Sequence, residues 1–217
     1  INIGHHSNNI NDCDVLVYSS AVNNENPEVK YAKDLGIPVI RRAEMLGELM
    51  KLKKISIGVS GTHGKTTTSS ILGNILLEAK VEPTLVIGGI VNKFNSNAIS
   101  GSGEIIVVEA DEFDKTFLQL SPTYSIINNL DLEHLDCYKN LEELQDSFIK
   151  FANSIPFYGK VAVCIDHKNT REIISKIKRP VTTFGIHENA NYKAKNISFN
   201  KLKTQFDLII YGQFIEK

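Results

Sequence analysis

The sequence predicts an α/β protein: a mainly parallel sheet with a phosphate loop, preceded by the tail of a small α/β domain. Three observations lead to this fold class. Apolar runs of strand length alternate with amphipathic segments of helix length along most of the chain. A glycine-rich turn, Gly61 to Gly64, lies between one such strand and the helix after it. The basic run Lys51-Leu52-Lys53-Lys54 marks a boundary, so we expect two domains, residues 1–52 and 53–217.

The first predicted domain, residues 1–52, contains two strand-helix units. Gly36 ends the first helix, because glycine favours the position just after a helix. Met45, Leu46 and Leu49 recur at helical spacing and predict one apolar face for the second helix. We expect strands over residues 14–18 and 37–40, and helices over 27–35 and 43–50.

The longer domain continues the alternation, which favours a parallel sheet covered on both faces. From Tyr192 onward, short alternating runs predict a small antiparallel hairpin region instead. We expect strands over residues 55–60, 84–88, 105–110, 124–128, 161–165 and 181–184, and helices near 66–79, 140–153 and 169–177.

Bulk composition excludes several classes of protein. The net charge is −1 and no basic stripe is present, so nucleic acid is not an expected partner. Cys13, Cys137 and Cys164 have no paired or metal-like spacing, which favours buried free thiols in a reducing cytoplasm. No segment reads as a membrane span or signal peptide, so we expect a cytoplasmic protein without membrane insertion. Because the chain begins at Ile1 and ends without a closing motif, we expect a piece of a longer protein.

The run Gly61-Thr62-His63-Gly64-Lys65-Thr66-Thr67 predicts a site for a nucleoside triphosphate. Glycines let backbone amides approach phosphate oxygens, and the N-terminus of the following helix adds partial positive charge. Lys65 can reach the outer phosphates, and the Thr66 hydroxyl can bind Mg²⁺. The match to the common pattern is imperfect, since that pattern has a glycine where Val59 stands. A turn that merely begins a helix is the simpler alternative.

Two polar clusters follow predicted strands and should lie at the same sheet edge as the loop. The first is Glu109-Ala110-Asp111-Glu112-Phe113-Asp114, whose four carboxylates would repel one another without a cation. Glu109, still on its strand, is therefore a predicted Mg²⁺ ligand. For the three later acids, a solvated turn that begins a helix at 112–118 is an equal alternative. The second cluster, residues 128–136, contains His134, which is either a metal ligand or an ordinary surface histidine.

The motifs GTHGKTTT, VVEADEFD and NNLDLEHLDCY, followed by FIKFANSIPFYGKVAVCIDH, together resemble the Mur ligases of peptidoglycan synthesis. The resemblance extends to about Asn196 and includes the segment from NPEV to LGIPVIRRAEMLGELM. It implies a Rossmann-like UDP-sugar-binding domain ending near residue 52, and a central ATP-binding domain over 53–217 that is incomplete at its C-terminus. His63 favours the branch that adds L-alanine to UDP-N-acetylmuramate, because most relatives that add later residues have asparagine there.

The same resemblance implies roles for particular residues. Gly61 to Thr67 bind the phosphates of ATP, and Asn129 lies near the nucleotide. Thr66 and Glu109 bind Mg²⁺, and His134 binds a second metal. Lys65, Glu109 and His134 are the expected catalytic residues. The implied substrates are UDP-N-acetylmuramate, L-alanine and ATP, and the chain by itself is expected to bind nucleotide weakly and to lack ligase activity.

Four positions differ from the family pattern. Glu133 replaces the usual aspartate, Asn128 the frequent threonine, and Phe113 the usual serine, which affects fine geometry more than the reaction. Lys150 is out of register with the carbamylated lysine of several relatives, so we expect it to be a surface residue of a helix.

Three other functions compete with alanine ligation. A recycling ligase, which attaches an intact peptide to the same sugar nucleotide, shares the His63-type loop. A phosphate-loop switch protein is a different class, but the chain lacks an Asn-Lys-x-Asp guanine motif. The last alternative is a non-catalytic fragment that binds a sugar nucleotide. Nucleotide-dependent amide formation, tested with alanine against tripeptide, separates all of them.

Overall fold

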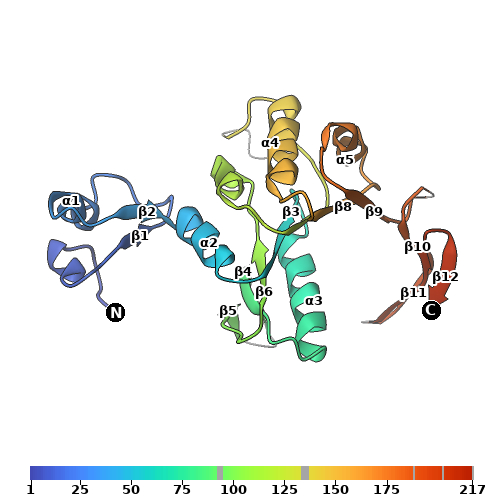
Figure 1. The fold of residues 1–217 in the computed structure, drawn as a ribbon, viewed down its shortest axis with the longest axis horizontal. Coiled ribbons are helices and arrows are strands. Elements are labelled where there is room, and N and C mark those ends of the chain that lie inside the picture. Colours follow the sequence, from blue (N-terminus) through green and yellow to red (C-terminus); the bar gives the residue numbers. More distant parts are fainter. Residues whose placement is uncertain (92–94, 133–136, 188, 202, 217) are drawn as a thin grey trace. The chain divides into compact units, whose positions relative to one another are not determined.

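The computed structural model describes residues 1–91, 95–132, 137–187, 189–201 and 203–216. It divides into two compact units, Ile1–Leu52 and Lys53–Lys217. Each unit contains its own sheet. Figure 1 gives the element labels.

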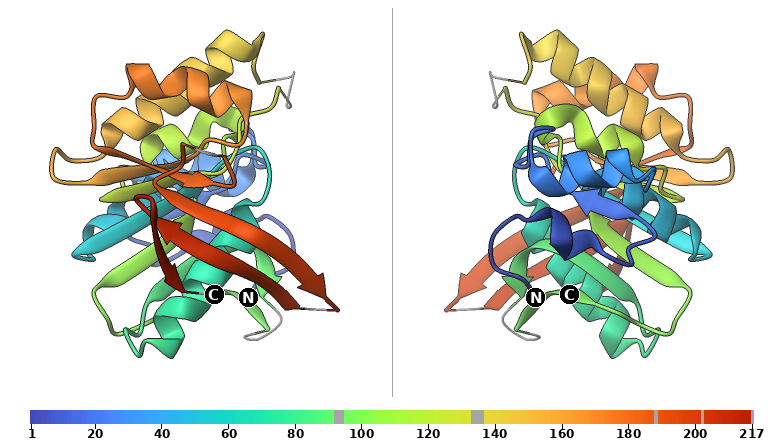
Figure 2. Two further views of the ribbon diagram at one scale, coloured as in Figure 1. Left: turned by 90° about the vertical axis from the view of Figure 1, so that its right-hand side faces the viewer. Right: turned by 90° about the vertical axis from the view of Figure 1, so that its left-hand side faces the viewer.

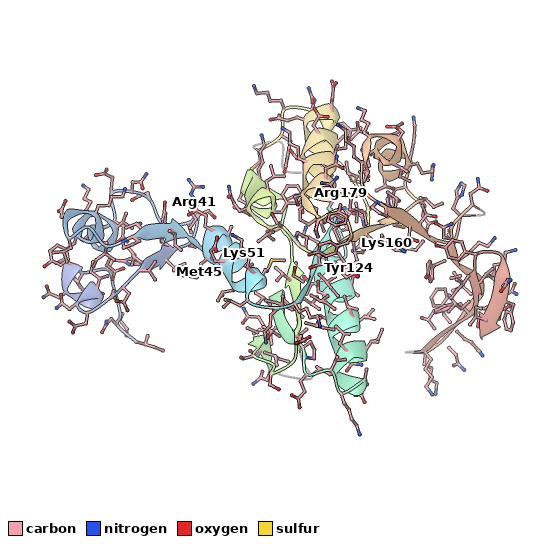
Figure 3. The ribbon with its side chains drawn as sticks, viewed as in Figure 1. Arg41, Met45, Lys51, Tyr124, Lys160 and Arg179 are labelled. Atoms are coloured by element: carbon pink, nitrogen blue, oxygen red, sulfur yellow. The ribbon has the colours of Figure 1, made fainter. Side chains whose placement is uncertain are left out.

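The first unit is a two-stranded parallel sheet with helices beside it. Asn26 caps the first helix by accepting a hydrogen bond from the Glu28 amide, and Pro27 occupies the first turn, where its missing N–H costs nothing. The second helix carries Met45 and Lys51 and follows Arg41, all labelled in Figure 3. It buries Gly47 and Met50, whereas Leu49, expected on the apolar face, is exposed. The elements are η1 (Ser7–Ile10), β1 (Leu16–Tyr18), α1 (Pro27–Asp34), β2 (Val39–Arg41) and α2 (Arg42–Lys51).

The second unit is built on a ten-stranded sheet whose order is β12-β11-β10-β9-β8-β7-β3-β6-β4-β5. From β4 through β3 to β10 the neighbouring strands are parallel, so the expected mainly parallel sheet is confirmed. The strands are β3 (Ile55–Ser60), β4 (Thr84–Val91), β5 (Ser96–Ile99), β6 (Ile105–Glu109), β7 (Tyr124–Ile127), β8 (Lys160–Cys164), β9 (Val181–Gly185), β10 (Tyr192–Asn200), β11 (Lys203–Ile210) and β12 (Gln213–Glu216).

Helices cover both faces of this sheet. Figures 1 and 2 show α3 on one face and α4 and α5 on the other. Right-handed crossovers explain the division, because β3 connects to β4 in one direction along the sheet and β7 to β8 in the opposite direction. The helices are α3 (Lys65–Glu78), η2 (Phe113–Gln119), α4 (Leu141–Ser154), α5 (Lys168–Ile173) and η3 (Ile174–Lys176).

Each face has its own apolar core. Beneath α3, a cluster of fully buried aliphatic residues includes Val59 of the central strand and Val107 of β6. On the opposite face, the ring of Phe117 lies 5.2 Å from that of Phe148 and 5.0 Å from that of Phe151. These packed layers hold β3 rigidly in the middle of the sheet.

The structure differs from the predicted elements in several places, of which three concern the larger sheet and its last helix. Strand β5 was not expected, and it pairs antiparallel with β4, which extends to Val91 rather than 88. The predicted last helix is a short α-helix, α5, continued by the 3₁₀ turn η3. The C-terminal hairpin is antiparallel as expected, but its first strand, β10, also joins β9 in parallel through Tyr192 and Lys193. Strand β5 was missed because its residues, SNAI, are short and mixed in polarity.

Candidate functional site

The glycine-rich loop lies at the carboxyl end of the central strand. β3 lies between β6 and β7 in the sheet. The chain runs from β3 toward β4 on the β6 side, and from β7 toward β8 on the other side, so the order of the strands reverses at β3. Ligands of open parallel sheets bind at such a switch point, beyond the carboxyl ends of the strands. The paired residues Tyr124 and Lys160, labelled in Figure 3, begin β7 and β8 at the opposite edge.

Two glycines of the loop have backbone conformations that other residues adopt only with strain. Gly61 has φ 135° and Gly64, which precedes the first residue of α3, has φ 77°. A Cβ on Gly61 would also lie 3.1 Å from the Asn129 nitrogen and 3.2 Å from the Asn128 nitrogen. The loop therefore passes so close to the segment after β7 that only glycine fits at position 61.

The segment after β7 holds the loop through paired hydrogen bonds. The Asn129 side chain accepts from the His63 amide at 2.7 Å and donates to the His63 carbonyl at 3.0 Å, as a neighbouring strand would. The Thr62 hydroxyl donates to the Asp131 carbonyl at 3.1 Å and accepts from the Asp131 amide at 3.0 Å. Because both partners bond backbone groups, the loop is fixed before any ligand arrives.

Lys65 extends back across the loop that precedes it. Its ammonium donates to the carbonyls of Gly61 at 2.9 Å and Thr62 at 3.3 Å. It also donates to Glu112 Oε2 at 2.8 Å, and Asp111 Oδ1 lies 3.7 Å away. The lysine side chain is only 12% exposed, so its positive charge faces the loop rather than open solvent.

Thr66 and Glu109 form the second polar pair of the site. The Thr66 hydroxyl lies 2.9 and 3.1 Å from the two carboxylate oxygens of Glu109, which also accepts from the Gly88 amide at 2.7 Å. A Cβ on Gly88 would lie 3.0–3.1 Å from that carboxylate, so a larger residue would crowd it. Hydroxyl and carboxylate oxygens are ligands that Mg²⁺ prefers, and this pair fits the predicted ion.

The metal would need further oxygens from a ligand. Among the described residues, no group of three or more His, Cys, Asp or Glu lies close enough together to hold a metal ion. Mg²⁺ typically keeps waters and binds through one or two protein groups plus substrate phosphates. The Thr66–Glu109 pair therefore suits a metal that arrives with a polyphosphate.

A hollow of about 370 Å³ opens beside the loop on the β7 side. This volume is within the range of small-molecule sites, roughly 300–1,000 Å³. The loop and the start of α3 form one wall, and the ends of β7, β8 and β9 form the other. The lining residues are His63, Gly64, Thr67, Thr68, Asn128, Asn129, Cys164, Asp166, His167 and Phe184.

The far wall of the hollow is fixed by Asp166. Its carboxylate accepts from the amides of Ile186 and His187, each at 2.9 Å. Gly185, with φ 142°, lies so close that an added Cβ would be 2.4 Å from the Asp166 carboxylate. Burial raises the pKa of the neighbouring Cys164 thiol, which favours its neutral form. This wall is thus preformed, with the Asp166 carboxylate held by backbone amides.

Most of the predicted site residues lie together. The structure brings Gly61 to Thr67, Glu109 and Asn129 to one sheet edge, although Asn129 bonds the loop backbone. His134, the predicted ligand of a second metal, lies outside the described residues, as does Glu133. Lys150 is exposed on α4, which confirms the expectation of a surface position. Cys13, Cys137 and Cys164 form no disulfide, as expected, but all three are half-buried rather than buried.

Two residues of the site were not singled out from sequence. Glu112 was left as an equal choice between metal ligand and solvated turn, yet its side chain is 1% exposed and paired with Lys65. Asp131 braces Thr62 through its backbone, which no side-chain pattern could indicate. One sequence feature could have indicated the role of Glu112: Lys65 of the loop and a cluster of four acids were predicted at the same sheet edge, where one acid can pair with the lysine.

The fold and this loop define the class: an α/β nucleotide-binding protein whose phosphate loop joins the central strand to a helix. Comparison with known families narrows the class. Residues 59–216 match the family model of the Mur ligase middle domain, and residues 1–54 match that of the Mur ligase family, catalytic domain. The chain belongs to the Mur ligase family.

Similar curated proteins share one name. UDP-N-acetylmuramate–L-alanine ligase of Syntrophus aciditrophicus is 47% identical over 205 residues, which is 94% of this chain and 42% of that protein. The protein of the same name from Persephonella marina is 48% identical over 213 residues, or 98% of this chain and 46% of that one. The chain thus spans less than half the length of these relatives.

Solved structures agree on the fold. UDP-N-acetylmuramate–alanine ligase from Thermotoga maritima matches with a TM-score of 0.79 and 26% identity, covering 97% of this chain and 47% of that one. A ligase from Neisseria meningitides that joins UDP-N-acetylmuramate to L-alanyl-γ-D-glutamyl-meso-diaminopimelate matches with a TM-score of 0.82 and 24% identity, covering 98% and 70%. The second likeness shows the fold alone.

Proposed function

We propose that this protein is an ATP-dependent amide ligase that joins L-alanine to the carboxylate of UDP-N-acetylmuramate, forming ADP and phosphate, in peptidoglycan synthesis. The observation that carries the proposal is the convergence of Lys65, Thr66 and Glu109 at the phosphate loop. The name shared by relatives at 47% and 48% identity supports the choice of substrates.

The residues of the loop suit phosphoryl transfer. The substrate carboxylate and the γ-phosphate of ATP are both anionic, so they approach only where positive charge offsets their repulsion. Lys65 supplies one such charge, from a side chain already directed across the loop. Thr66 and Glu109 would hold Mg²⁺, which, when bound, neutralises charge on the phosphates. The carboxylate becomes an acyl phosphate, and the amine of L-alanine then displaces phosphate.

The hollow beside the loop is the proposed place for the nucleoside end of ATP. It adjoins Gly64 and Thr67 on one side and Phe184 on the other. Phe184 offers an aromatic surface on which a base can stack, and the backbone-bonded Asp166 keeps that wall in place. Asn129 contributes by fixing the loop at the boundary of the hollow.

The two units receive separate roles in this proposal. Residues 1–52 are the C-terminal part of a domain that binds the UDP-sugar, and residues 53–217 belong to the central ATP-binding domain. His134 is the proposed ligand of a second metal and the third catalytic residue, with Lys65 and Glu109. No helix among the described residues is both long and apolar enough to cross a membrane. We place the enzyme in the cytoplasm, where its nucleotide substrates are found.

A coupled assay of the full-length protein tests the proposal. Phosphate release from Mg²⁺-ATP would be measured with UDP-N-acetylmuramate plus L-alanine, with the same sugar nucleotide plus tripeptide, and with no acceptor. We expect release only with alanine, together with a new amide product by mass spectrometry. Release with tripeptide instead would assign the recycling reaction, and release without any acceptor would assign a nucleotide hydrolase.

A further inference from the structure

Glu112 is a buried carboxylate next to the phosphate loop that the proposed chemistry does not use. Its side chain is 1% exposed, and its Oε2 lies 2.8 Å from the ammonium of Lys65. An ionised carboxylate is buried in proteins only when it is paired, because desolvation strongly disfavours the charged form. Its neighbour Asp111, also an acid, is 57% exposed and 3.7 Å from the same ammonium. The two acids thus differ in burial and distance while facing one lysine.

Glu112 is held from behind by a buried tyrosine. The Tyr138 hydroxyl donates to the Glu112 carbonyl at 2.6 Å, and the Lys115 amide donates to the same oxygen at 3.0 Å. Tyr138 is fully buried, and burial together with the nearby Glu112 charge raises its pKa well above the usual value. The hydroxyl therefore stays protonated and remains a donor. These bonds fix the residue that carries the carboxylate.

The carboxylate completes the hydrogen bonding of Lys65. An ammonium has three donors, and Lys65 directs them at the carbonyls of Gly61 and Thr62 and at Glu112. A phosphate that binds Lys65 must therefore compete with acceptors already present. It must also approach a fixed negative charge, which opposes its binding.

We propose that Glu112 is a positioning residue: it fixes the Lys65 ammonium across the loop and limits how tightly the loop holds phosphate before reaction. This inference rests on the proposed function of the loop. Interactions that bind the substrate and the transition state equally do not speed the chemical step. By weakening the binding of phosphate in the ground state while keeping the Lys65 ammonium oriented, Glu112 therefore favours turnover. Removing the carboxylate should then strengthen the binding of phosphate compounds and lower kcat.

Binding of pyrophosphate and of ADP, measured by calorimetry with EDTA present, tests the charge effect without turnover. For Glu112→Gln, which keeps shape but loses charge, we expect pyrophosphate to bind about 5- to 30-fold more tightly, as removal of a nearby unit charge predicts. The matched control is Asp111→Asn. It removes the same charge from an exposed position, where solvent screens it, and should change affinity by less than about twofold.

Steady-state kinetics of the full-length protein test the positioning effect. We expect Glu112→Gln to lower KM for ATP while lowering kcat about 10- to 100-fold, because a neutral amide oxygen holds the Lys65 ammonium less firmly than a carboxylate does. Glu112→Asp, which restores the charge, should recover part of kcat and the wild-type pyrophosphate affinity. If Glu112 merely supported the fold of the loop, Glu112→Gln would bind pyrophosphate more weakly and raise KM, and the inference would be wrong.

Two further measurements keep the outcomes distinct. If Glu112→Gln does not fold, Tyr138→Phe replaces it. This change removes the hydroxyl that donates to the Glu112 carbonyl and also interacts with the Ser147 side chain. We expect shifts in the same two directions, about two- to fivefold each. Weaker pyrophosphate binding by that variant would also overturn the inference. Failure of the wild-type protein to bind either pyrophosphate or ADP would instead overturn the proposed function.

Discussion

The two sides of strand β3 are chemically different. On the side of β6 and β4, the loop faces charged groups: Glu109 beside Thr66, and Glu112 beside Lys65. On the side of β7, the hydrogen-bond partners of the loop are neutral groups: the Asn129 amide and the backbone of Asp131. The loop itself is common to both sides, so the difference lies entirely in the residues at the carboxyl ends of the neighbouring strands.

This difference separates two tasks. The charged side can bind a cation and oppose the charge of phosphates, and its groups act through electrostatics over several ångström. The neutral side fixes the loop through short, directional hydrogen bonds and borders the hollow. We therefore expect substitutions on the charged side to affect turnover and metal dependence, and those on the neutral side to affect stability and affinity.

The largest effect is expected for Lys65→Ala. No other cation of the loop is available to offset phosphate charge, so kcat/KM for ATP should fall by about 10³-fold or more. Steady-state phosphate release measures it, with Lys150→Ala as the control, because Lys150 is exposed on α4. Near wild-type turnover by Lys65→Ala would contradict the assignment of the charged side.

Glu109→Gln should follow, with kcat reduced about 10²-fold. The change keeps the size of the side chain but removes the carboxylate that lies beside Thr66. The readout besides turnover is the gain in ADP affinity on adding Mg²⁺, which the variant should lose. Glu104→Gln serves as control, since Glu104 precedes the same strand and is 70% exposed. An unchanged Mg²⁺ response would rule out Glu109 as a metal ligand.

On the neutral side, Gly61→Ala should destabilise the protein by about 2–3 kcal/mol, from backbone strain and crowding together. The added Cβ would lie 3.0–3.2 Å from Asn128 and Asn129. Gly212→Ala is the matched control, because Gly212 also has positive φ, 82°, but nothing lies within 4 Å of its added Cβ. Denaturant unfolding compares the two. Equal losses would show that the close approach at Gly61 contributes nothing.

Asn129→Ala should have the smallest effect, about a tenfold loss of ADP affinity, because the loop would no longer be fixed before binding. Asn153→Ala is a closely matched control. Asn153 also bonds backbone on both sides, accepting from Lys178 at 2.7 Å and donating to Lys176 at 3.4 Å, away from the loop. Both variants should lose similar stability, and only Asn129→Ala should lose affinity. Equal affinities would assign Asn129 a purely structural role.

Much of the fold could be predicted from the sequence because local signals agreed with the global arrangement. The strand at 55–60 was placed at its observed bounds, and α3 begins one residue before the predicted start. Both rest on apolar periodicity and on a glycine turn, which depend only on neighbouring residues. That the loop, Lys65, Thr66 and Glu109 lie together at one sheet edge could be predicted for the same reason. A short motif at the end of a strand is enough to indicate the chemistry of these residues.

The features that could not be predicted depend on contacts distant in sequence. The burial of Glu112 results from its approach to Lys65, 47 residues away, and four neighbouring acids give no indication of which one is enclosed. The bracing of Thr62 by the Asp131 backbone spans 69 residues and involves no distinctive side chain. Strand β5 could not be predicted for a different reason. Its residues have only a weak local preference for a strand, and pairing with β4 overrides that preference.

The central place of β3 also has a consequence for how the protein is made. Ile55 pairs with Ile105 of β6, and Ser60 bonds to the Ile126 carbonyl of β7, 66 residues away. Contacts so distant along the chain form slowly, because loop-closure entropy must be overcome first. During synthesis, residues 61–67 leave the ribosome well before either flanking strand exists. A nascent chain therefore acquires the proposed nucleotide site only after β7 has emerged, and stalled chains that end before Tyr124 should bind no ADP.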